Sequence, residues 1–115
     1  MATTPAARAA RGSTREWLAR RDPAPAALAR RLAEVLGPAG LDAPHTPDRY
    51  LAAAESLLGS MLHEGCATRE AALDLLVCDA LVTYAFEAAA DEPARLEAMT
   101  RQAMTRIAAL AADIR

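Results

Sequence analysis

Hydrophobic residues recur at intervals of three and four along most of the chain, which is the spacing of one face of an α-helix. Thr46 and Pro47 are favourable residues for the cap and the first position of a helix, and Gly65 is favourable for its end. We therefore predict a helix at 47–64. Its apolar stripe consists of Tyr50, Leu51, Ala54, Leu57, Leu58, Met61 and Leu62.

The other segments predict four more helices, whose ends are marked by capping residues, glycines and prolines. The expected spans are 13–21, 22–36, 68–89 and 93–115. Ser13 with Glu16 has the pattern of a capping box, and Thr68 is a favourable cap for the helix that follows it. Residues 37–47 contain two glycines and three prolines, so we expect a loop and an internal hinge there.

The helix predicted at 68–89 is apolar around most of its circumference, and its polar line is Asp79, Thr83 and Glu87. A helix that is apolar nearly all round must be surrounded by protein, so we expect this helix at the centre of the fold. Short connections on both sides of it make its sequence neighbours antiparallel to it. We therefore predict an all-α fold, an up-and-down helical bundle of four to five helices.

Charge divides the chain into a basic N-terminal part and an acidic body. Residues 1–31 hold seven arginines and two acidic residues, a balance of +5, whereas residues 32–115 carry −7. Residues 1–12 offer no large apolar side chain beyond the initiator methionine, so we expect a disordered basic tail followed by a single helical domain at 13–115. This basic arm would be the only route to nucleic acid, and such an arm equally solvates a tail or folds against an acidic body.

Cysteine usage and hydropathy predict a cytoplasmic protein. Cys66 and Cys78 are too few for a disulfide framework, and their predicted positions lie roughly 15 Å apart, so we expect a reducing compartment. No apolar run approaches the ~20 residues of a transmembrane span, so we expect no membrane association. The 31 alanines and 13 arginines, with no lysine, fit a GC-rich genome, which we take to be bacterial.

No constellation of residues in this sequence predicts a metal or a cofactor. His63, Glu64 and Cys66 lie within four residues of one another, but a zinc site needs a fourth ligand and paired spacing. His45 lies in the proline-rich loop, where we expect a structural role, and Cys78 in a leucine-rich helix is most simply an inert core thiol. We predict no catalytic residue, no metal ligand and no bound cofactor.

Glu70 and Asp74 invite comparison with the all-α nucleoside-triphosphate pyrophosphohydrolases, which hold Mg²⁺ on carboxylates from two helices. Those enzymes pair a Glu-rich motif with a Glu-x-x-Asp motif, whereas Glu70 and Asp74 are four residues apart and the helix at 47–64 offers only Glu55 and Glu64. No glycine-rich phosphate loop or arginine cluster accompanies them. A Mg²⁺-dependent nucleotide phosphohydrolase is therefore our third hypothesis.

The helix at 47–64 has a second face made of small residues. Small residues let another helix approach closely, and a glycine inside a helix costs roughly 1 kcal/mol relative to alanine. Our first hypothesis is a non-enzymatic helical interaction module that binds a second copy of itself, as a homodimer, or another protein, through this face or the basic arm. The face consists of Ala52, Ser56, Gly59 and Ser60.

The second hypothesis is a helical bundle that binds a small molecule or a metal. Its site would be the polar line Asp79, Thr83 and Glu87, with Tyr84 nearby. The identity of a partner or a ligand does not follow from the sequence under either hypothesis.

Overall fold

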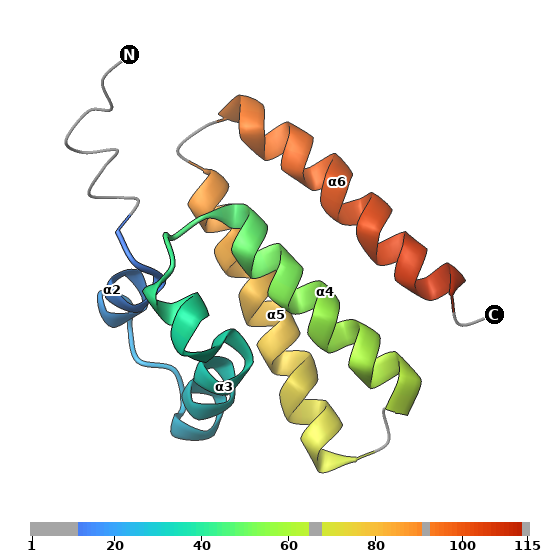
Figure 1. Ribbon diagram of the computed structural model, residues 1–115, viewed down its shortest axis with the longest axis horizontal. Helices are drawn as coiled ribbons and strands as arrows, with labels where there is room; N and C mark the ends of the chain where they lie inside the picture. The colour runs from blue at the N-terminus through green and yellow to red at the C-terminus, as the bar shows by residue number, and fades with distance from the viewer. Residues whose placement is uncertain (1–11, 65–67, 91–92, 114–115) are drawn as a thin grey trace.

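Five α-helices form a bundle in the part of the chain that the computed structural model describes, residues 12–64, 68–90 and 93–113 (Figure 1). The predicted all-α class is therefore confirmed. Residues 1–11 of the predicted tail at 1–12, the Gly65 cap and Cys66 lie outside the described residues. In chain order the helices are α2 (Thr14–Ala19), α3 (Ala26–Asp42), α4 (Pro47–Glu64), α5 (Arg69–Ala89) and α6 (Pro93–Ala112).

Two of the predicted helix caps are present. The side-chain oxygen of Ser13 accepts the backbone N–H of Glu16 at 3.1 Å and begins α2. In the same way, the hydroxyl of Thr68 accepts the N–H of Ala71 at 3.1 Å and begins α5. Each cap satisfies a backbone donor that has no partner within its helix.

The segment before α2 is paired with the segment before α4. The N–H of Thr14 donates to the carbonyl of Ala43, and the N–H of His45 donates to the carbonyl of Gly12, both at 2.9 Å. These bonds belong to a short antiparallel bridge, which anchors α2 on the body of the fold. Gly12, the first described residue, thus takes part in this bridge.

Helix α3 starts later than predicted. The sequence places the start at residues 22–23, whereas the helix begins at Ala26 after Pro25, which has φ −52° and ψ 144°. A residue that precedes a proline is disfavoured in the helical region, so Ala24 does not extend the helix backwards. Residues 22–25 therefore form a linker between α2 and α3.

The end of α3 also differs from the prediction of a loop at 37–47. Gly37 has φ 70°, a left-handed conformation that interrupts the helix, but Pro38 begins a further helical stretch that continues to Asp42. Proline fits the first turn of a helix because its φ is already helical and its missing N–H would have no partner there. The loop prediction is wrong for residues 38–42, and the interruption is a kink at a single glycine.

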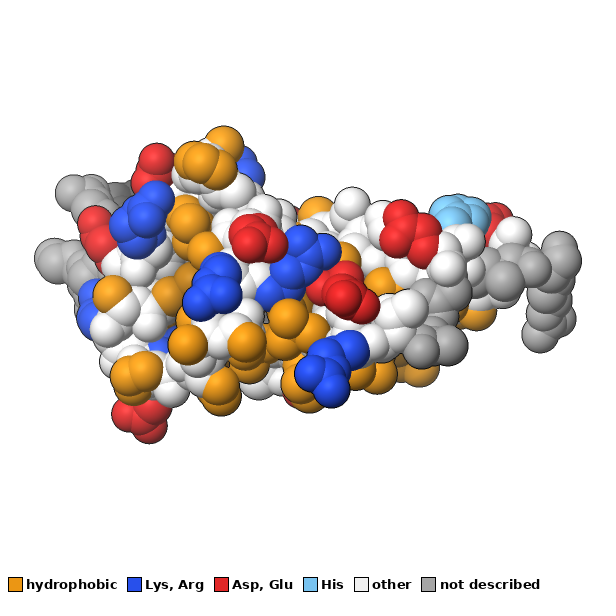
Figure 2. Space-filling model, turned by 90° about the horizontal axis from the view of Figure 1, so that it is seen from below, with side chains coloured by type: hydrophobic (Ala, Val, Ile, Leu, Met, Phe, Trp, Pro, Cys, Tyr) orange, Lys and Arg blue, Asp and Glu red, His pale blue; other side chains and the backbone are white. Residues whose placement is uncertain are grey.

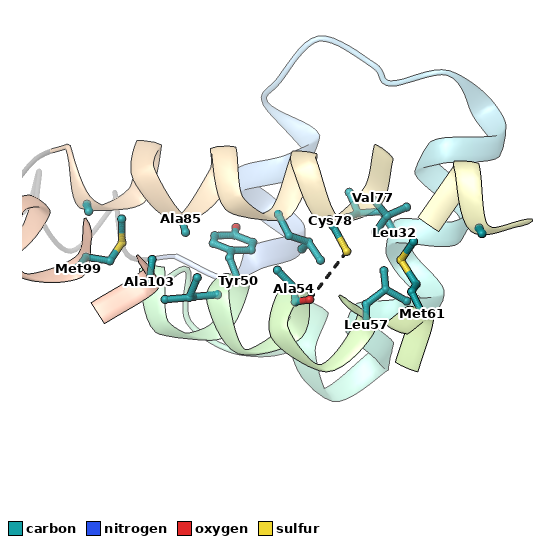
Figure 3. Packing of buried hydrophobic residues seen from close by; sticks show 14 residues of the cluster. Leu32, Tyr50, Ala54, Leu57, Met61, Val77, Cys78, Ala85, Met99 and Ala103 are labelled. Atoms are coloured by element: carbon teal, nitrogen blue, oxygen red, sulfur yellow. Dashed lines mark hydrogen bonds between the residues drawn. The ribbon is translucent and has the colours of Figure 1, made fainter. Parts of the chain in front are cut away.

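Helices α4 and α5 form an antiparallel hairpin at the centre of the bundle, and their mutual contact is the most extensive between any two described helices (Figure 1). Figure 3 shows how their side chains interdigitate, with the Cys78 sulfur 3.8 Å from the carbonyl oxygen of Ala54. Helix α3 contributes Leu32 to this core, and α6 contributes Met99 and Ala103. The hairpin therefore carries the other helices on its two sides.

Helix α5 is central but is not buried on all sides as predicted. One face is fully buried and includes Val77, Leu81 and Ala85, each with 0% exposure. Leu75 and Leu76, on the opposite face of α5, are each 57% exposed, because none of the described helices covers them. The expectation that protein surrounds this helix everywhere except along its polar line is therefore wrong for these two leucines.

Helix α6 lies against α4 and α5 and is fixed by an ion pair to α4. The guanidinium of Arg106 donates to both carboxylate oxygens of Glu55 at 2.8–3.1 Å. These hydrogen bonds lower the pKa of Glu55.

Within the described ranges, no helix combines the length and the hydropathy that are needed to cross a bilayer.

Candidate functional site

Four aromatic rings from separate parts of the chain meet between α2, α4 and α5. Trp17 of α2 stacks on His45, with ring centroids 4.2 Å apart and an interplanar angle of 22°. Tyr84 of α5 meets Trp17 edge-on at 5.3 Å and Tyr50 of α4 at 5.7 Å. Edge-to-face and stacked pairs at these distances are favourable beyond the area they bury. We call Trp17, His45, Tyr50 and Tyr84 the ring cluster.

The deepest pair of the ring cluster is joined by a hydrogen bond. Tyr50 is fully buried, its hydroxyl lies 2.7 Å from Nδ1 of His45, and His45 itself is only 6% exposed. Burial raises the pKa of Tyr50 to about 12, since the phenolate would be poorly solvated. His45 lies in the non-helical segment before α4, as the sequence predicts, and its ring is buried against Tyr50 and Trp17.

Arg21 covers the outer edge of the ring cluster. Its guanidinium carbon lies 4.5 Å from the centroid of the Trp17 ring and 4.9 Å from that of Tyr84. The same guanidinium donates two hydrogen bonds to the carboxylate of Glu87, one of them at 3.0 Å. These bonds raise the pKa of Arg21, so this cation is held between two rings and one carboxylate.

A pocket of about 320 Å³ opens beside the ring cluster, between α2, the linker at 22–25, α3 and α5. We call it the α2–α3 pocket. Its walls are mainly aliphatic, and the ring of Tyr84 closes it on the side of α5. The aliphatic lining comes from Leu18, Ala19, Ala29, Leu32, Ala33 and Leu41.

The charged residues of the α2–α3 pocket are Arg15, Arg21 and Asp22. Arg15 donates to Asp42 of α3 from Nε at 3.3 Å and from Nη2 at 3.2 Å, an exposed ion pair. The pocket therefore combines an apolar interior with a few polar groups at its edge, which is the usual composition of a small-molecule site.

The predicted polar line of α5 is only partly associated with this pocket. Glu87 is the ion-pair partner of Arg21, and Tyr84 forms a wall of the pocket. Thr83 donates its hydroxyl hydrogen to the carbonyl of Asp79 at 2.9 Å, and both residues are exposed. The structure thus places Tyr84 in the pocket wall, connects Glu87 to the pocket only through Arg21, and leaves Asp79 and Thr83 on the surface.

The small-residue face of α4 is also divided by the structure. Ala52, Ser56 and Ser60 are exposed, whereas Gly59 is half-buried. A Cβ atom at Gly59 would lie 3.7 Å from a methyl carbon of Leu110, which is an ordinary van der Waals distance. The close neighbour of Gly59 is therefore α6 of the same chain.

Several large hydrophobic side chains remain on the surface of α5 and α6. They are Leu75 and Leu76 at 57%, Met104 at 69% and Ile107 at 40% exposure. On the face shown in Figure 2, hydrophobic side chains gather between acidic and basic ones. Exposed apolar residues mark a partner surface where they are contiguous.

The carboxylates considered for Mg²⁺ are not arranged around a common point. Both oxygens of Asp74 accept hydrogen bonds from Arg31, from Nε at 2.7 Å and from Nη2 at 3.3 Å, and Glu70 is exposed. Among the described residues, no three His, Cys, Asp or Glu side chains form a group that could hold a metal ion.

Cys78 is a free, buried thiol, and burial raises its pKa.

Three of the five described arginines in the basic N-terminal part pair with carboxylates of the acidic body. Arg15 contacts Asp42, Arg21 contacts Glu87 and Arg31 contacts Asp74. The sequence left open whether the basic arm solvates a tail or folds against the acidic body. These three arginines fold against the acidic body. The arm's arginines at positions 8 and 11 lie outside the described residues.

The ring cluster is the feature that sequence reasoning missed. A usable signal was present: the chain has only four Trp, Tyr and Phe residues, and three of them meet here. In an alanine-rich chain, the aromatic residues are the natural candidates for a shared cluster. Their spacing in the sequence, however, does not reveal that they converge.

Comparison of the chain with protein-family models, with curated proteins and with solved structures finds no match in any of the three. The function must therefore be argued from the site itself.

Proposed function

We propose that this protein is a small-molecule-binding helical bundle whose ligand occupies the α2–α3 pocket. The observation that carries the proposal is the pocket itself: about 320 Å³, an aliphatic interior, one aromatic wall and charged groups at its edge. Pockets for organic ligands begin at about 300 Å³ and have this composition. The ring cluster supports the proposal because it holds α2, one wall of the pocket, against α4 and α5 by side chains that do not depend on a ligand.

Trp17, the single tryptophan of the chain, provides a direct measurement. Its ring contacts both Arg21 and Tyr84, which line the pocket, so a bound molecule is expected to change its fluorescence. We propose a screen of small neutral, anionic and cationic compounds by tryptophan fluorescence and by melting temperature. Compounds that act on the wild type in both assays are then tested on two variants.

The two variants place the same bulky side chain on different sides of α3. Ala33→Phe fills the pocket, because Ala33 lines it, whereas Ala27→Phe is a matched control on an exposed position outside the lining. Binding that is lost in Ala33→Phe and kept in Ala27→Phe supports the proposal. Binding that both variants keep, or the absence of any binding compound, contradicts it.

A second candidate function is the interaction module, acting as a homodimer. The exposed hydrophobic side chains of α5 and α6 favour it, since a second copy could cover Leu75, Met104 and Ile107. Light-scattering mass over a range of protein concentrations tests it. Met104→Glu should shift a dimer toward monomer while Ala98→Glu, elsewhere on α6, should not, and a monomeric wild type would contradict this function.

We place the protein in the cytoplasm under either function. The free thiol of Cys78 in the core supports a reducing compartment.

A further inference from the structure

The two arginines at the edge of the α2–α3 pocket already have carboxylate partners that do not line it. Arg21 is held by the carboxylate of Glu87, and Arg15 is held by that of Asp42. Asp22 is the third charged residue of the lining. Counted with their partners, these groups are two cations and three anions, so the edge has no excess positive charge to attract an anion.

The interior of the pocket cannot compensate a charge either. Its walls are the aliphatic side chains of Leu18, Leu32 and Leu41, with alanines between them, and the ring of Tyr84. A charged group that enters such a space loses hydration without gaining an opposite charge. An anion would have to displace Glu87 or Asp42 from an arginine. A cation would meet one net negative charge, that of Asp22, which is exposed and therefore screened by water.

Resting on the proposed function, we infer that the α2–α3 pocket takes an uncharged, largely apolar ligand. Its apolar part lies between α2 and α3, and its polar group remains at the edge near Arg15 and Asp22. The volume of about 320 Å³ is at the lower end of the range for organic ligands, so the ligand is compact.

Three probes with the same alkyl chain isolate the effect of charge: 1-octanol, octanoate and octylammonium. Each is titrated at neutral pH, below its micelle concentration, into the full-length wild type and into Ala33→Phe and Ala27→Phe, with tryptophan fluorescence and calorimetry as readouts. We expect 1-octanol to bind at least ten-fold more tightly than either charged probe. Its affinity should fall at least ten-fold in Ala33→Phe and stay within two-fold in Ala27→Phe.

A further variant tests the reason for the preference. Glu87→Gln removes the charge that neutralises Arg21, so octanoate should gain several-fold in affinity relative to 1-octanol. Asp79→Asn removes a charge from an exposed position of the same helix and should leave the ratio unchanged. An unchanged ratio in Glu87→Gln would contradict the argument from paired charges.

The outcomes separate the ligand class from the site. Tighter binding of octanoate or octylammonium than of 1-octanol in the wild type, lost in Ala33→Phe, keeps the pocket and overturns the uncharged class. Binding of all probes that is insensitive to Ala33→Phe, or no binding of any probe, refutes the proposed function itself.

Discussion

The residues that organise this fold are few, and their burial differs sharply between neighbours in the sequence. Leu75 and Leu76 are more than half exposed, whereas Val77, one position further, is fully buried. Cys78 and Leu81 continue the buried face of α5. At the scale of single residues, the contribution to stability should therefore follow the helical face rather than hydrophobicity.

Leu81→Ala should destabilise the protein by about 2–5 kcal/mol, because Leu81 has 0% exposure and its removal leaves a cavity in the core. The matched change Leu75→Ala, on the same helix at an exposed position, should alter the free energy of unfolding by no more than about 0.5 kcal/mol. Urea denaturation of both variants measures these values. Equal losses for the two leucines would mean that the outer face of α5 is covered.

Tyr50 should make stability depend on alkaline pH. Its folded-state pKa is about 12, while its ordinary value is 10.0. The unfolded chain therefore ionises first, so the stability due to the neutral phenol is complete below pH 10 and is lost as the pH rises toward 12. The loss should reach roughly 2–3 kcal/mol.

Denaturation of the wild type and of Tyr50→Phe at pH 9 and pH 11 checks this expectation. The wild type should lose more stability between the two pH values than Tyr50→Phe does, since the variant lacks the ionisable hydroxyl. An identical loss in both proteins would show that the Tyr50 hydroxyl ionises as it does in the unfolded chain.

At the scale of helices, the glycines have opposite roles. Gly37 interrupts α3 with φ 70° and ψ 167°, a conformation that residues with a Cβ atom rarely adopt. Gly59 lies within α4 and is half-buried, and a Cβ atom added there would be at an ordinary contact distance from Leu110 of α6. One glycine is required by the backbone, and the other only lowers the helical propensity of its element.

Alanine at the two positions should accordingly change stability in opposite directions. Gly59→Ala should stabilise the protein by about 0.5–1 kcal/mol, because the added methyl makes an ordinary contact with Leu110 and alanine favours the helix. Gly37→Ala should destabilise it by about 1–3 kcal/mol through backbone strain. Thermal and urea unfolding of the pair provides the comparison, and a destabilised Gly59→Ala would indicate a tighter contact between α4 and α6.

At the scale of the whole molecule, ion pairs between helices connect segments that are distant in the sequence. Arg21 links the end of α2 to α5, Arg31 links α3 to Asp74 of α5, and Arg106 links α6 to Glu55 of α4. The bundle is thus joined at its periphery by arginines as well as by its apolar core. Such pairs determine the relative placement of helices more than they determine whether the helices form.

The Glu55–Arg106 pair should make the attachment of α6 sensitive to acid. The pKa of Glu55 is lowered from 4.5 by hydrogen bonds from Arg106, so its stabilisation is present above pH 4.5 and is lost as the pH falls through the folded-state pKa. Glu55→Gln should be less stable than the wild type at pH 7. This difference should shrink progressively as the pH falls below 4.5. A difference that stays the same size as the protein is acidified would contradict a charged pair.

The sequence by itself determined the helical class, the two caps at Ser13 and Thr68 and the buried face of α4. These features depend on local propensity, on capping chemistry and on a period of three to four residues, all of which act within about one or two helical turns. The kink of α3 was harder to predict from the sequence. Gly37 and Pro38 mark an interruption, but whether a helix resumes after it depends on the packing of the segment that follows.

Only the tertiary structure decided which side of α5 is covered and which aromatic residues meet. Leu75, Leu76 and Leu81 are the same residue type in one helix, and only the packing of the other helices decides that Leu81 is buried and the first two are exposed. The ring cluster and the α2–α3 pocket join residues from the beginning, middle and later part of the chain. No local pattern encodes such a meeting, since it results from how whole helices pack.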